Sequence, residues 1–151
     1  MHIVHDDLLS NITGLLTGET DPIANAANTA AAIWQQMPAI NWAGFYFLRG
    51  DTLVLGPFQG KPACVRIPLG QGVCGTAAAR RETIVVADVH AFPGHIACDS
   101  ASNSEIVVPL IHNGAVIGVL DIDSPDLSRF GAAEKAVCEA IAAAYVASLG
   151  T

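Results

Sequence analysis

The sequence predicts an α+β fold in which one mostly antiparallel sheet is flanked by helices. Alanine-rich stretches such as "AANTAAAIW" and "AAEKAVCEAIAAAYVA" predict helices, because alanine has the highest helix propensity. Two apolar runs joined by Asn113-Gly114 predict a β-hairpin, and a hairpin pairs its strands antiparallel. The chain has 151 residues, of which 52% are hydrophobic and 14% charged, so we expect one domain over residues 1–151.

The first element that can be delimited is a helix over residues 18–37. Thr20 or Asp21 can cap this helix, Pro22 suits its first position, and Pro38 marks its end. The stretch that follows is rich in aromatic and β-branched residues, which is typical of strands.

That stretch, residues 41–58, is predicted to be a hairpin that turns at Gly50-Asp51. The later elements are a strand over 63–69, a short helix over 70–82, a strand over 83–89, a loop without structure of its own over 90–105, a hairpin over 105–124 and a helix over 131–149. The last helix presents Val137, Ile141, Ala144 and Tyr145 at the helical period. Cys138 fits the same side and is expected in the core.

Charge and composition exclude several classes of function. The seven basic residues are scattered and the net charge is −7, so no surface is expected to follow a nucleic-acid backbone. Pro38 and several amide and hydroxyl side chains interrupt the uncharged stretch 22–48, so no membrane span is expected. The N-terminus lacks the pattern of a secretory signal, which favours the cytoplasm, where thiols are normally reduced.

Cys98 stands in a polar loop, "GHIACDSASNSE", although a free cysteine is usually buried. Long loops in compact domains are often functional, so Cys98 is a candidate reactive thiol. The cysteines form no Cys-x-x-Cys pair, which argues against a zinc knuckle. An alternative zinc site would use His90, His95 and Cys98 as three of its four ligands.

Asp121 and Asp123 lie two residues apart in an apolar strand, so both carboxylates point from the same face of the sheet. Repulsion and desolvation favour a protonated form of one of them, which could donate a proton. The alternative is a strand end that runs into solvent through an ordinary turn. A thiolate with a proton donor can reduce an electrophilic oxygen compound, and a peroxide and a sulfoxide both fit.

Five successive motifs resemble those of the free methionine-(R)-sulfoxide reductases, which are single GAF-domain enzymes. The motifs are "NWAGFY", "GPFQGKPAC", "IPLGQGVCGTA", "GHIACDSASNSEIVVPL" and "GVLDIDS". The resemblance implies a GAF-type fold with about six antiparallel strands. By motif, Cys98 resembles the catalytic nucleophile, Cys64 the resolving cysteine, and Cys74 an additional thiol that can take part in disulfide exchange.

The resemblance also implies a substrate site. Glu105, Asp121 and Asp123 resemble the acidic cluster around the substrate, and Trp42 and Tyr46 resemble its aromatic wall, although plain core packing is the alternative for the two aromatic residues. A free amino acid has an ammonium group that carboxylates can bind. Its α-carboxylate needs N–H donors, which we expect from the backbone of Ile96, Ala97 and Cys98.

The implied reaction needs no metal or cofactor. Cys98 attacks the sulfoxide sulfur, Asp121 or Asp123 protonates the oxygen, and Cys64 or Cys74 converts the sulfenic acid to a disulfide that thioredoxin reduces. A homodimer is compatible with the resemblance. Two alternatives are a non-catalytic GAF module that senses a small ligand and a thiol peroxidase that uses Cys98.

Overall fold

A computed structural model describes residues 2–95 and 101–150 of the chain. In chain order its elements are α1 (His2–Leu16), α2 (Pro22–Gln36), β1 (Trp42–Arg49), β2 (Thr52–Gly60), β3 (Arg66–Pro68), α3 (Gly72–Arg80), β4 (Ile84–Val86), the short 3-10 helix η1 (Val89–Ala91), β5 (Ser104–His112), β6 (Ala115–Ser124) and α4 (Ala132–Ser148).

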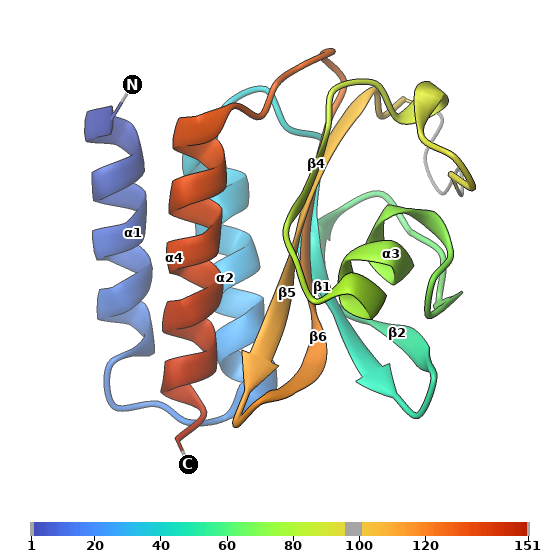
Figure 1. Cartoon of the computed structure of the whole chain (residues 1–151). Helices are drawn as coiled ribbons and strands as arrows, with labels where there is room; N and C mark the ends of the chain where they lie inside the picture. The colour runs from blue at the N-terminus through green and yellow to red at the C-terminus, as the bar shows by residue number, and fades with distance from the viewer. Residues whose placement is uncertain (1, 96–100, 151) are drawn as a thin grey trace.

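The strands form one six-stranded sheet in the order β3-β2-β1-β6-β5-β4, and every neighbouring pair is antiparallel. This confirms the predicted α+β fold and its antiparallel sheet. The helices α1, α2 and α4 stand together on one side of the sheet, whereas α3 lies on the other side (Figure 1). Among the described residues, no helix is both long enough and apolar enough to cross a membrane.

Both hairpins turn where the sequence predicts. Asn113 and Gly114 have φ values of 52° and 81°, so both adopt the left-handed conformation that a two-residue hairpin of the favoured hand requires. Gly50 also has a positive φ of 65° between β1 and β2. These turns place β1 beside β2 and β5 beside β6, while β1 pairs with β6 in the middle of the sheet.

The helix α2 begins as predicted, because Asp21 caps it and accepts a hydrogen bond from the backbone N–H of Ala24 at 2.8 Å. The N-terminal helix α1 was not delimited by the sequence analysis. Its buried residues Leu8, Ile12 and Leu16 recur every four positions, which is a helical pattern.

The sheet separates two cores. Ala43, Phe45 and Phe47 of β1 point into the core that the three long helices cover, where Cys138 is fully buried as predicted. Trp42 and Tyr46 of the same strand point to the opposite core, under α3. This alternation follows from the period of two along a strand.

Three predicted boundaries need correction. The strands β3 and β4 are three residues each, shorter than the predicted 63–69 and 83–89, because they pair only at the two edges of the sheet. The predicted loop over 90–105 is not wholly irregular. The helix η1 continues to Ala91 with Asp88 as its cap, and β5 already begins at Ser104.

Candidate active site

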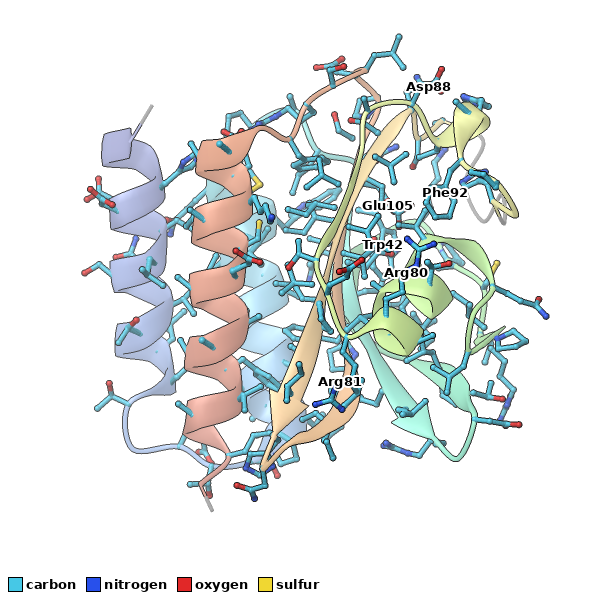
Figure 2. The ribbon with its side chains drawn as sticks, viewed as in Figure 1. Trp42, Arg80, Arg81, Asp88, Phe92 and Glu105 are labelled. Atoms are coloured by element: carbon cyan, nitrogen blue, oxygen red, sulfur yellow. The ribbon has the colours of Figure 1, made fainter. Side chains whose placement is uncertain are left out.

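A cleft opens between α3 and the face of the sheet formed by β1, β5 and β6. It holds about 560 Å³ of empty space, open solvent included. Its lining residues are Trp42, Tyr46, Pro62, Ala63, Ile67, Gly72, Val73, Cys74, His95, Ser102, Glu105, Asp121 and Asp123. Figure 2 shows Trp42 and Glu105 on this side of the sheet, away from the three long helices.

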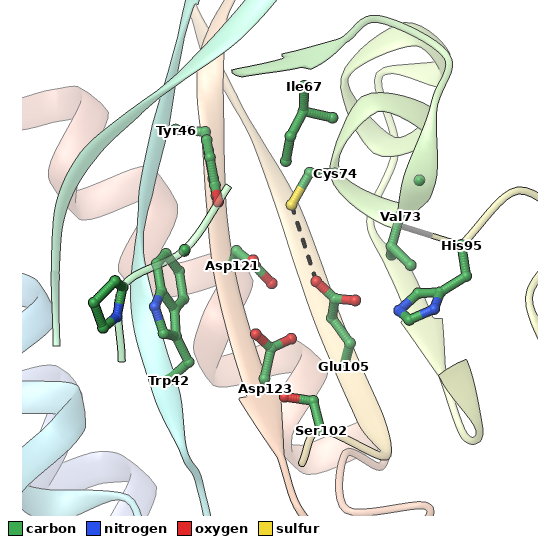
Figure 3. Close-up of a pocket in the computed structure, with 13 residues that line it drawn as sticks. Trp42, Tyr46, Ile67, Val73, Cys74, His95, Ser102, Glu105, Asp121 and Asp123 are labelled. Carbon is green, nitrogen blue, oxygen red and sulfur yellow. Dashed lines mark hydrogen bonds between the residues drawn. The ribbon is translucent and has the colours of Figure 1, made fainter. Parts of the chain in front are cut away.

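The floor of the cleft is a row of side chains that crosses three strands. Glu105 of β5 is paired with Asp123 of β6, and Asp123 is paired with Trp42 of β1. Because residues directly opposite in an antiparallel pair share a face, all three side chains point to the cleft. Asp121 lies two residues before Asp123 and therefore points the same way, as predicted (Figure 3).

A β-bulge sets this arrangement. Near the turn, Ile111 is paired with Val116, but the register shifts by one residue between Ile111 and Leu110. Without this shift, Glu105 would lie opposite Ile122 and would point to the helix side of the sheet. The bulge therefore turns the Glu105 carboxyl to the same side as both aspartates, which is a common role of bulges beside active sites.

The acidic cluster favours bound protons. Glu105 is 8% exposed, and burial, together with the charges of Asp121 and Asp123, raises its pKa well above the usual range. Burial also raises the pKa of Asp121, although hydrogen bonds with Glu105 and Cys74 oppose this rise. Its Oδ1 atom is buried and has no hydrogen-bond partner among the described residues. Such an orphaned oxygen is costly unless a ligand or a proton satisfies it.

Cys74 faces this cluster from α3. Its Sγ atom is 3.9 Å from Oε2 of Glu105 and donates a weak hydrogen bond to it (Figure 3). Burial and the nearby charge of Asp121 raise the pKa of the thiol well above its usual value. Cys74 therefore remains a protonated thiol at neutral pH in this environment.

The opposite wall is aromatic. The rings of Trp42 and Tyr46 stack at a centroid distance of 5.9 Å, and Phe58 of β2 stacks behind Trp42 at 5.2 Å. Gly44 lies between Trp42 and Tyr46 on β1 and faces Phe58. A Cβ atom at Gly44 would be only 2.3 Å from Phe58 Cβ. Trp42 and Tyr46 thus line the cleft and also belong to the core under α3.

Tyr46 links the aromatic wall to the segment that carries Cys64. Its hydroxyl donates a hydrogen bond of 2.9 Å to the backbone carbonyl of Cys64. Burial, followed by the charge of Asp121, raises the pKa of this hydroxyl, so it stays protonated and remains a donor. Cys64 is disulfide-bonded, whereas Cys74 and Cys138 carry free thiols.

Six of the predicted site residues therefore meet at one cleft, namely Trp42, Tyr46, Cys74, Glu105, Asp121 and Asp123. Cys64 lies beside it, next to the lining residue Ala63. Three predicted site residues lie outside the described residues, namely Ile96, Ala97 and Cys98. Cys98 is also one of the three ligands of the alternative zinc site. In that set His95 lines the cleft, whereas His90 is exposed and lies 3.0 Å from Asp88.

Several residues that shape the cleft are not among the predicted site residues, and Ser102 and Gly44 are two of them. Ser102, which is buried and lies 3.4 Å from Asn41 Oδ1, carries no signal in the sequence. Gly44 did carry one, because a glycine inside a strand often marks a close approach of another chain segment.

Residues 15–149 match the model of the GAF domain family. The free methionine-R-sulfoxide reductase of Escherichia coli strain K12 is 60% identical over 124 residues, covering 82% of this chain and 75% of that protein. The enzyme of the same description from Saccharomyces cerevisiae is 46% identical over 145 residues, which cover 91% of this chain and 81% of that protein. An X-ray structure of free methionine-R-sulfoxide reductase from Neisseria meningitidis in complex with its substrate has a TM-score of 0.95 at 45% identity, covering 98% of this chain and 89% of that one. The chain therefore belongs to the GAF domain family and, within it, to the free methionine-R-sulfoxide reductases.

Proposed function

We propose that this chain reduces free L-methionine-(R)-sulfoxide to methionine. The observation that carries the proposal is the acidic cluster of buried Glu105, buried Asp121 and half-buried Asp123 opposite the aromatic wall, in a chain 60% identical to an enzyme of this description. The cleft offers carboxyl groups for the substrate's ammonium group and for the sulfoxide oxygen, which accepts a proton. It also offers an apolar wall for the methyl group and the sulfur.

The substrate's methyl group and sulfur pack against Trp42, because contacts of sulfur with aromatic rings are favourable. The ammonium group is bound by carboxylates of the acidic cluster. The α-carboxylate is bound by backbone N–H groups of Ile96, Ala97 and Cys98, which lie outside the described residues. Because a peptide bond removes both charges of the amino acid, a site that binds both ends discriminates strongly against sulfoxide in proteins.

In the chemical step the Cys98 thiolate attacks the sulfoxide sulfur. The bond between the substrate sulfur and oxygen breaks, and the oxygen is transferred with a proton to the Cys98 sulfur. The substrate sulfur is thereby reduced to the thioether, and Cys98 is oxidised to a sulfenic acid. The proton comes from the acidic cluster. The raised pKa values of Glu105 and Asp121 support a shared proton there, so Glu105 joins the two aspartates as a candidate donor.

Cys64 then condenses with the sulfenic acid, which releases water and forms a disulfide. Cys64 is already disulfide-bonded and Cys74 is a free buried thiol, which supports Cys64 as the first resolving cysteine and Cys74 as a later exchange partner. Thioredoxin, a cytoplasmic dithiol, supplies two electrons and restores both thiols. Recycling by a cytoplasmic dithiol supports a cytoplasmic location. We further propose that the enzyme acts as one domain, alone or as a homodimer.

The test is a single turnover without added reductant. Fully reduced protein is mixed with excess methionine-(R)-sulfoxide, and methionine released per chain is counted. Wild type and the control Cys138→Ala, altered only in the distant core, are expected to release at least one equivalent. Cys64→Ser is expected to release one equivalent but to fail in recycling by thioredoxin, and Cys98→Ser is expected to release none. Release by Cys98→Ser would overturn the mechanism.

A further inference from the structure

Three buried groups with metal-binding atoms converge at the closed end of the cleft. Cys74 of α3, Glu105 of β5 and Asp121 of β6 each offer one atom, and these three atoms lie within 4.8 Å of one another. The side chains are buried on three different elements that the sheet and α3 hold in place. Figure 3 shows the Cys74 sulfur directed at Glu105, with Asp121 beside them on the neighbouring strand.

The separations suit a small tetrahedral cation. With Zn–S near 2.3 Å and Zn–O near 2.0–2.2 Å, sulfur and oxygen ligands of one zinc ion lie about 3.5 Å apart. Cys74 Sγ and Glu105 Oε2 are 3.9 Å apart, and all three ligand atoms lie within 4.8 Å of one another, so side-chain rotations that bring these atoms to that separation would close the site. Three protein ligands would leave the fourth position open to the cleft, as in zinc sites that also bind a small molecule.

A second observation points to a ligand here. Asp121 is 5% exposed, and its Oδ1 atom is buried on the face of the sheet that lines the cleft, where no described residue forms a hydrogen bond with it. A cation would satisfy this oxygen and would also neutralise carboxylates that otherwise repel one another. One thiolate with two carboxylates is a donor set for Zn²⁺ or Co²⁺, whereas Mg²⁺ and Ca²⁺ prefer oxygen ligands alone.

We propose that Cys74, Glu105 and Asp121 bind a thiophilic divalent cation, with Zn²⁺ as the type ion, and that the bound ion blocks the cleft to substrate. Binding forms one metal–sulfur and two metal–oxygen bonds, and it releases the thiol proton and any proton on the carboxyl groups to solvent. The ion is an inhibitor and takes no part in the reaction. The blocking half of this inference rests on the proposed function, because it requires that substrate uses the same acidic cluster.

The test uses Co²⁺ as a spectroscopic probe of the full chain in its disulfide form. In that form Cys64 is disulfide-bonded, so Cys74 and Cys138 are the free thiols among the described residues. One equivalent of Co²⁺ is expected to give a thiolate charge-transfer band in the near ultraviolet and the visible bands of tetrahedral cobalt, and Zn²⁺ is expected to abolish both.

Matched variants identify the ligands. Cys138→Ala, which changes a thiol behind the sheet, is expected to bind Co²⁺ like wild type. Cys74→Ser is expected to lose the charge-transfer band. Asp121→Asn keeps the thiol but is expected to lower the affinity for Co²⁺ at least about tenfold, which is the loss typical of mutating a residue that only supports a metal ligand. A wild-type chain without these bands, or a band that Cys74→Ser retains, would overturn the inference. Unfolding curves of both variants confirm that they are folded.

Competition separates this inference from the proposed function. Saturating methionine-(R)-sulfoxide is expected to raise the Co²⁺ concentration needed for half-saturation. An unchanged value in a chain that releases methionine overturns the blocking half alone. A chain that shows the Co²⁺ bands but releases no methionine overturns the proposed function and leaves the metal site supported.

Discussion

Gly44→Ala tests how the aromatic wall is built. The added Cβ atom would lie 2.3 Å from Phe58 Cβ and 2.8 Å from both Phe58 Cα and Trp42 Cη2. Two of these contacts are with atoms at or next to the backbone of β2, which is paired with Gly44 itself, so a rotation of one side chain cannot relieve them. The strands must separate or the Trp42 ring must move.

Overpacking of this kind costs about 1–3 kcal/mol. We expect the free energy of unfolding to fall by about 2 kcal/mol, which for a chain of this size lowers Tm by about 4–8 °C. Because Trp42 is displaced, we also expect a higher KM for methionine sulfoxide. Urea unfolding gives the first quantity and initial rates of methionine release give the second.

Gly14→Ala is the matched control for this substitution. Gly14 lies in α1, and a Cβ atom there would meet nothing within 4 Å. Replacing a helical glycine by alanine is expected to stabilise the fold by about 0.5–1 kcal/mol. If Gly44→Ala unfolds at the same urea concentration as wild type, or if both variants lose stability equally, the close approach of Gly44 and Phe58 is not what constrains the wall.

Three further predictions concern single side chains. The first, measured in EDTA, is that the free energy of unfolding of wild type falls relative to that of Glu105→Gln as the pH rises above about 4.3. The reason is that the raised pKa of Glu105 makes the native state keep a proton that the unfolded state has lost. A difference in unfolding free energy between the two proteins that stays constant from about pH 5 to 8 in urea would contradict this. Tyr46→Phe removes the hydrogen bond to the Cys64 carbonyl and is expected to cost about 1 kcal/mol in thermal unfolding; an unchanged Tm would show that the bond contributes nothing. Asp21→Ala removes the cap that accepts from Ala24 and is expected to cost about 0.5–2 kcal/mol without changing kcat/KM, and a change in kcat/KM would refute its purely structural role.

Local signals were sufficient for most of the fold. The Asn113-Gly114 turn and the cap of α2, predicted to be Thr20 or Asp21, each depend on residues adjacent in the chain, so the sequence predicts them. The helix α1 was overlooked although Leu8, Ile12 and Leu16 recur at a helical spacing. The sequence therefore carries the signal for this helix.

The site depends on contacts that no local pattern encodes. Asp121 and Asp123 could be placed on one face from their spacing alone, but Glu105 joins them only because the bulge at Leu110 shifts the register of β5 on β6. The approach of Cys74 to Glu105 joins residues 31 positions apart in the chain. The raised pKa of Glu105 follows from these two arrangements and could not be deduced before them.

The most direct test of the proposed activity is methionine release from the separate R and S epimers of free methionine sulfoxide, with dithiothreitol as reductant. Dithiothreitol removes any dependence on the identity of the natural dithiol, so the result reports on the cleft and its thiols alone. We predict rapid release from the R epimer and none above background from the S epimer. Release from neither epimer, or equal release from both, would contradict the account.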